Sequence, residues 1–138
     1  MNGHALVYPM FAMVVLTFAV LVTLFRTRLG AVRAGAVNAG YFKTYQKGSE
    51  PEASAQLARH FVNLFEAPTL FYVACLAAMF SGQSSALLIG LAWLYVACRL
   101  VHSFIHTGSN QLNPRIAAYF SSWFVLLGMW VCIVIGVA

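Results

Sequence analysis

The chain has 138 residues, of which 62% are hydrophobic and 8% are charged. Soluble domains carry about 25% charged residues, and a chain this short has too small an interior to bury so much apolar surface, so an ordinary soluble domain is excluded in favour of one compact membrane domain. Eight Lys and Arg against three Asp and Glu give a net charge of +5, but the basic residues form no run, so membrane topology explains them better than nucleic-acid binding.

Four apolar segments are predicted to cross the bilayer as helices, since a spanning helix needs about 20 residues. They run from about 5–25, 55–80, 86–105 and 116–137. The first has no Lys or Arg before it and is longer than a signal-peptide core, which favours a retained helix. Short connections between the later segments favour an antiparallel four-helix bundle, so the predicted fold class is an all-α integral membrane domain spanning residues 1–138.

The connections differ in charge. Residues 26–52 contain five of the Lys and Arg residues, residues 81–85 are uncharged, and the connection 107–114 ends beside Arg115. Under the positive-inside rule, the first and third loops are expected in the cytoplasm and both termini outside.

The second apolar segment contains polar residues at helical spacing. Arg59, Asn63 and Glu66 stand at i, i+4 and i+7 and would project from one face of a helix. Ionisable groups at membrane depth are costly and usually face a protein interior or a wet cavity. Pro68 follows and would free the carbonyl of Leu64, which predicts a kink there.

The third segment has a matching stripe, because Tyr95, Arg99, His102 and His106 stand at i, i+4, i+7 and i+11 among apolar residues. Both stripes are expected to turn inward at similar depth. An ion pair of Glu66 with Arg99 or Arg59 would merely tie helices together. However, two arginines against one carboxylate leave a positive charge, which suits an anionic ligand.

The histidines permit a second interpretation. His102 and His106 lie one helical turn apart, and His60 could join them in ligating a metal or a haem. No cysteine or second carboxylate completes a recognisable ligand set, so the sequence predicts no metal and favours hydrogen bonding or ligand contact. Cys75, Cys98 and Cys132 fall in separate apolar stretches without C-x-x-C spacing and are predicted to be small apolar filler.

Two motifs, Arg59-x-x-x-Asn63-x-x-Glu66 and Arg99-Leu100-x-His102, resemble the MAPEG superfamily of membrane-associated proteins in eicosanoid and glutathione metabolism. Length, four apolar segments and the basic first loop resemble it as well, in a bacterial-type branch. The resemblance implies a homotrimer in the bacterial inner membrane, with glutathione bound between subunits. It also implies a set of glutathione-binding residues: Arg59, Asn63, Glu66, Tyr95, Arg99, His102 and His106.

The same resemblance implies a glutathione transferase or peroxidase in which glutathione is the co-substrate and the thiolate attacks a lipophilic small molecule arriving from the bilayer. Catalytic members place an arginine just past the third helix, where this chain has Asn113, with Arg115 two residues on. Arg115, Arg26 and Arg28 are therefore the candidates for stabilising the thiolate. The departure at Asn113 favours the alternative, a non-catalytic lipid-binding or scaffold protein. A small transporter is disfavoured, because no second charged segment completes a crossing path.

Overall fold

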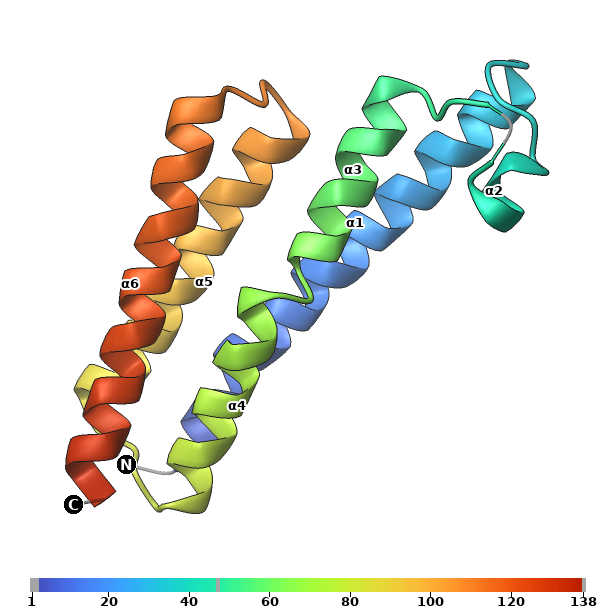
Figure 1. Cartoon of the computed structure of the whole chain (residues 1–138). Helices are drawn as coiled ribbons and strands as arrows, with labels where there is room; N and C mark the ends of the chain where they lie inside the picture. The colour runs from blue at the N-terminus through green and yellow to red at the C-terminus, as the bar shows by residue number, and fades with distance from the viewer. Residues whose placement is uncertain (1–2, 47, 138) are drawn as a thin grey trace.

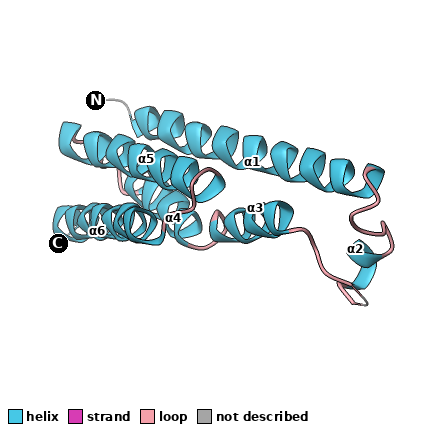
Figure 2. Ribbon diagram, turned by 90° about the horizontal axis from the view of Figure 1, so that it is seen from above, coloured by secondary structure: helices cyan, strands magenta, loops and turns pink. Residues whose placement is uncertain are grey.

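The computed structural model describes residues 3–46 and 48–137, and these residues are helical with no strand among them (Figures 1 and 2). A short 3-10 turn, η1 (Gly3–Leu6), leads into α1 (Val7–Arg33), and the single turn α2 (Tyr41–Thr44) lies in the long connection that follows. The other elements are α3 (Glu52–Asn63), α4 (Ala67–Phe80), α5 (Ala86–Thr107) and α6 (Leu112–Val137). The predicted all-α class is confirmed.

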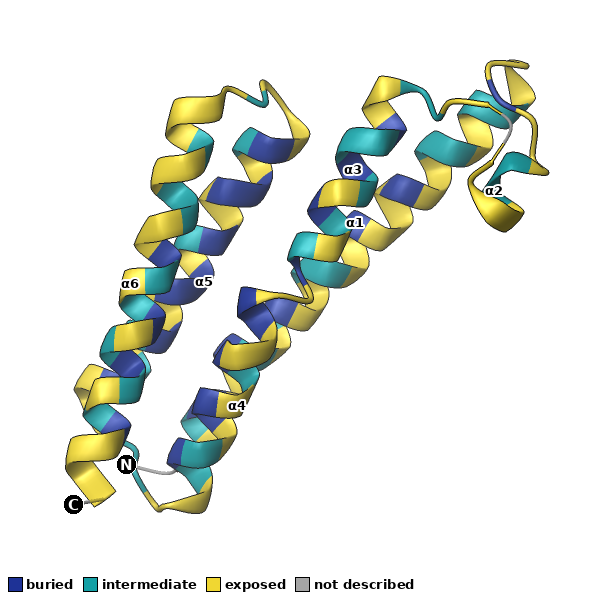
Figure 3. Cartoon of the chain, viewed as in Figure 1, coloured by how far each residue is buried: buried dark blue, intermediate teal, exposed yellow. Residues whose placement is uncertain are grey.

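Four stretches are long and apolar enough to cross a membrane: His4–Arg33, Glu52–Phe80, Ala86–Thr107 and Leu112–Val137. Large apolar side chains are exposed along these stretches; Phe18, Phe104 and Phe124 are 64%, 81% and 71% exposed. Figure 3 shows exposed positions recurring along the helices. Lipid contact removes the cost of exposing such surface, so the chain is an integral membrane protein.

The second stretch is broken, and the prediction of one continuous helix carrying Arg59, Asn63 and Glu66 on a single face is wrong. Helix α3 ends at Asn63, and Glu66 caps α4 with φ −88° and ψ −98°, outside the helical region. Pro68 lies in the first turn of α4, because it has no N–H for the Leu64 carbonyl and its ring would clash with that carbonyl in a continuous helix. The break therefore changes the direction in which the Glu66 side chain projects.

Small residues and one aromatic stack hold the helices together. Ala74, Ala78 and Ala92 are fully buried, which lets backbones approach closely. The Phe71 ring of α4 lies parallel to the Tyr95 ring of α5, with 4.4 Å between centroids and 8° between planes. Offset ring pairs of this kind stabilise by about 0.5–1.5 kcal/mol beyond the area that they bury. The Phe71–Tyr95 contact fixes α4 against α5 next to the polar residues.

The long connection between α1 and α3 folds back on the end of α1. The Arg28 Nε donates to Glu50 Oε1 over 2.7 Å, and its guanidinium carbon lies 4.8 Å from the centre of the Phe42 ring and 5.7 Å from that of Tyr45. A charge pair combined with ring contacts orders the segment. Arg28 is thereby engaged by residues of the same chain.

A side-chain cap begins α5 and supports a stability prediction. The Ser85 Oγ accepts a hydrogen bond from the Leu88 N–H over 3.2 Å. We expect Ser85→Ala to lower the free energy of unfolding by about 1 kcal/mol and Ser85→Gly by only a few tenths. Denaturant unfolding of the detergent-solubilised variants measures both. An unchanged free energy of unfolding in Ser85→Ala would show that the cap contributes nothing.

Candidate functional site

A buried arginine lies at the centre of the polar residues. Arg99 on α5 is fully buried, and its Nη2 donates to Asn63 Oδ1 over 2.5 Å and to the Asn63 carbonyl over 3.4 Å. Its guanidinium carbon lies 5.8 Å from the centre of the Tyr119 ring. The Nε and Nη1 atoms have no hydrogen-bond partner among the described residues. Burying a charge costs several kcal/mol unless partners compensate it, so this guanidinium has capacity for an anion nearby.

Asn63 links this arginine to Glu66. The Asn63 Nδ2 donates to Glu66 Oε2 over 3.1 Å, while its Oδ1 accepts from Arg99. The direct ion pair that the sequence left open, Glu66 with Arg99 or Arg59, is not formed, because Arg28–Glu50 is the only pair within 4.0 Å in the described part of the chain. Because the helix breaks after Asn63, the exposed Glu66 carboxylate lies beside the Asn63 amide. This amide therefore hydrogen-bonds to both the Glu66 carboxylate and the Arg99 guanidinium.

A pocket of about 220 Å³ opens between α3, α5 and α6; we call it the inner pocket. Its lining contains four of the predicted site residues, Asn63, His102, His106 and Arg115, together with Ile116 and Tyr119. The Arg115 Nη1 donates to Asn110 Oδ1, and the Arg115 carbonyl lies 3.1 Å from His102 Nδ1. The predicted stripe of the third segment therefore does meet the second segment.

A larger pocket of about 630 Å³ lies between α1, α3 and the connection that joins them; we call it the outer pocket. Its charged lining consists of Arg28, Glu50, Arg59 and Glu66, and Tyr45 and apolar residues of α1 and α3 complete it. Arg59 and Glu66 are exposed, whereas Arg28 is held by Glu50. The structure thus divides seven of the ten predicted site residues between two pockets, and the Asn63–Glu66 hydrogen bond joins one residue of each.

Three predicted site residues that the structure describes, Arg99, Tyr95 and Arg26, line neither the inner nor the outer pocket. Tyr95 is fully buried against Phe71, so its ring is part of the core rather than of a pocket wall. Arg26 is exposed near the end of α1, and Asn113, the residue at the expected arginine position, is exposed in the first turn of α6. Neither is among the residues that line the inner or the outer pocket in the described part of the chain.

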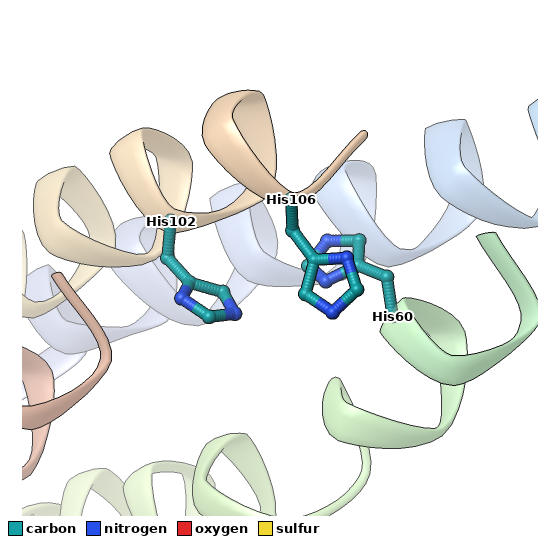
Figure 4. Close-up of side chains that lie close together, drawn as sticks. All are labelled: His60, His102 and His106. Carbon is teal, nitrogen blue, oxygen red and sulfur yellow. The ribbon is translucent and has the colours of Figure 1, made fainter. Parts of the chain in front are cut away.

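His60 is more central than the sequence analysis made it. The side chain is fully buried, its Nε2 lies 2.8 Å from Ser103 Oγ, and its ring centre is 4.8 Å from that of His106 and 5.6 Å from that of His102 (Figure 4). A signal was present, because Leu57, His60 and Leu64 stand at i, i+3 and i+7 and are all buried.

Comparison with known proteins places the whole bundle in one family. The family model described as the MAPEG family matches residues 6–135, which is nearly the full chain and includes both pockets. Comparison with curated proteins finds no match, and comparison with solved structures finds none either. The chain belongs to the MAPEG family, the membrane-associated proteins of eicosanoid and glutathione metabolism.

Proposed function

We propose that the protein binds the charged groups of glutathione in the outer pocket, with the thiol directed past Asn63 toward the inner pocket, and acts as a glutathione transferase or peroxidase on lipophilic electrophiles. The observation that carries the proposal is the exposure of Arg59 and Glu66 within a stretch of membrane-spanning length. An ionised side chain facing lipid costs about 2.5–3.5 kcal/mol on insertion scales. A zwitterionic tripeptide that pairs with both groups removes that cost.

The charges of glutathione fit these residues. Glutathione has two carboxylates and one ammonium group; Arg59 would hold a carboxylate by parallel N–H donors, and Glu66 would accept from the ammonium. Asn63 is fixed between Glu66 and Arg99, so its amide is pre-oriented. The uncompensated Arg99 guanidinium behind it adds positive potential for the second carboxylate.

Oligomer formation would complete this site. In the homotrimer that we propose for the antiparallel bundle, a neighbouring subunit covers the exposed Arg59 and Glu66, and glutathione lies between subunits. The connections 34–51 and 108–111 would then face the cytoplasm of a bacterial cell, where glutathione is available. This arrangement places the charged residues away from lipid.

An apolar groove of about 560 Å³ offers a place for the second substrate. It runs between α1, α3 and α5, with walls that include Val20, Leu57, Leu100 and Phe104, and it reaches Ser103, the hydrogen-bond partner of His60. A lipophilic molecule can enter such a groove from the bilayer. In a conjugation, the thiolate attacks the electrophilic carbon, the C–S bond forms, and the leaving group departs with the bonding electrons.

Arg115 is the arginine best placed to stabilise the thiolate, because it lines the inner pocket while Arg28 is paired with Glu50. A thiol has a pKa of about 8.5, and a nearby cation lowers it. We expect Arg115→Ala to reduce kcat/KM for a chloronitroaromatic electrophile by about 10- to 100-fold, with little change in the KM for glutathione. Steady-state conjugation by protein in lipid nanodiscs measures both constants.

The matched control is Arg33→Ala, which removes an exposed arginine at the end of α1 and should leave both constants unchanged. An equal kcat/KM for Arg115→Ala and the unmodified protein would show that Arg115 does not stabilise the thiolate.

A non-catalytic lipid-binding protein is the second candidate function. Asn113 favours it, because the expected arginine is missing and the residue present is exposed. In that case lipid would co-purify in the apolar groove, and no thiol conjugation would be detected with any electrophile tried.

A further inference from the structure

Three histidines form a buried cluster beside the inner pocket. His60 of α3 and His102 and His106 of α5 are 0%, 3% and 8% exposed. Each offers a ring nitrogen, and these three nitrogens lie within 4.8 Å of one another (Figure 4). We propose that the cluster binds a divalent transition-metal ion of the Zn²⁺ class, with one coordination position open to the inner pocket.

The hydrogen bonds around the cluster leave nitrogens available. A carbonyl can only accept, so His102 Nδ1, 3.1 Å from the Arg115 carbonyl, carries the hydrogen, and Nε2 presents a bare lone pair. A backbone carbonyl that fixes the tautomer in this way is the common second partner of a metal-ligating histidine. At His60, Nε2 lies 2.8 Å from Ser103 Oγ, a hydroxyl that can donate or accept, and this contact holds the ring in position.

Each histidine also has one buried nitrogen without a partner. These atoms are His60 Nδ1, His102 Nε2 and His106 Nδ1. Leaving a buried polar atom unsatisfied costs about 1–3 kcal/mol, so three in one cluster call for a common partner. A metal ion accepts the lone pairs of several imidazoles at once, whereas a single water has only two hydrogens to donate.

The size and charge of the surroundings define the ion. Zinc–nitrogen bonds of about 2.0–2.1 Å place tetrahedral ligand atoms about 3.3 Å apart, so the nitrogens must close by about 1.5 Å, through ring rotations. The inner pocket, at about 220 Å³, is smaller than the roughly 300–1,000 Å³ of sites for larger ligands, which disfavours a haem. Imidazoles supply no charge and Arg99 and Arg115 are close by, so the fourth ligand should be an anion.

The thiolate of glutathione is such an anion, and this part of the inference rests on the function proposed above. When the thiol binds the ion, the S–H bond breaks, the sulfur–metal bond forms with the sulfur lone pair, and the proton passes to solvent. The ion would then supply the cation that Asn113 does not, with the Arg115 side chain beside it.

Metal titration tests the site without any activity measurement. The full chain, purified without a histidine tag into nanodiscs, is titrated with Co²⁺ and, separately, with Zn²⁺ followed by elemental analysis. We expect one ion per protomer and the visible absorption of tetrahedral Co²⁺. His102→Ala should weaken binding at least 100-fold and Ser103→Ala about 10- to 100-fold, since Ser103 only positions His60.

His4→Ala is the matched control, because His4 is exposed and is the one remaining histidine of the four. It should leave the affinity unchanged. Ser103→Ala keeps all three ligands and tests only the positioning of His60. Absence of stoichiometric binding to the unmodified protein, or equally tight binding in His102→Ala, would overturn the site.

Glutathione is then added to the Co²⁺-loaded protein. A near-ultraviolet sulfur-to-cobalt band is expected if the thiolate takes the open position. If equilibrium dialysis shows that glutathione binds but no band appears, the thiolate ligand is wrong while the metal site stands. If glutathione does not bind at all, the function proposed above fails instead.

Discussion

Arg59→Ala is expected to weaken glutathione binding by about 10- to 100-fold, since a hydrogen-bonded contact to a charged group contributes about 1.5–3 kcal/mol. The stability of the bundle should not change by more than about 0.5 kcal/mol, because Arg59 is exposed and forms no ion pair within the described residues. Isothermal titration of nanodisc-embedded protein with glutathione gives the affinity, and denaturant unfolding gives the stability.

Glu66→Gln refines this prediction. The amide oxygen of glutamine can still accept from Asn63 Nδ2, so the bridge to Arg99 is kept and only the charge offered to the glutathione ammonium is lost. We expect a weaker affinity with unchanged stability. Arg33→Ala, at the C-terminal end of α1 and outside the outer-pocket lining, serves as the control for a general loss of positive charge. Affinity that falls equally in Arg33→Ala would mean that the outer pocket has no special role.

Asn63→Leu should have the largest effect on stability. It removes the one side chain that accepts from Arg99 and so leaves a fully buried guanidinium with no side-chain hydrogen bond in the described structure. Leaving a buried charged donor without its acceptor costs at least about 1–3 kcal/mol. Denaturant unfolding in detergent should show this loss, and glutathione binding should fall with it.

A double variant separates stability from binding. Asn63→Leu combined with Arg99→Met removes the buried charge together with its acceptor, and paired apolar replacement is often neutral or stabilising. We expect the double variant to recover most of the stability of the unmodified protein and to remain unable to bind glutathione. A double variant as unstable as the sum of the single losses would contradict the coupling of these two residues.

Composition and residue spacing are enough to predict the membrane stretches and one of the two polar stripes, and two motifs indicate the family. The four membrane stretches follow from segment length and apolarity, and the inward turn of Arg99, His102 and His106 follows from their spacing on the unbroken helix α5. The likeness of two short motifs was enough to indicate the MAPEG family, which the family model confirms over residues 6–135.

The rest depended on geometry that spacing does not specify. The i, i+4, i+7 rule assumes an ideal helix, and the three residues Leu64–Glu66 interrupt it, so Glu66 lines the outer pocket while Asn63 lines the inner one. The effect of Pro68 on the Leu64 carbonyl was predictable as a kink, but not as a break that sets the direction of Glu66. Likewise, the approach of His60 to His106 depends on how α3 packs against α5, and residue spacing within one helix does not specify that packing.

The most direct test of the central claim is equilibrium dialysis of radiolabelled glutathione against the unmodified protein and Arg59→Ala in nanodiscs, at glutathione concentrations up to the millimolar range. We expect saturable binding to the unmodified protein and a marked loss in Arg59→Ala, with Arg33→Ala behaving like the unmodified protein. Absence of saturable binding at millimolar glutathione, or equal binding by the unmodified protein and Arg59→Ala, would contradict this claim.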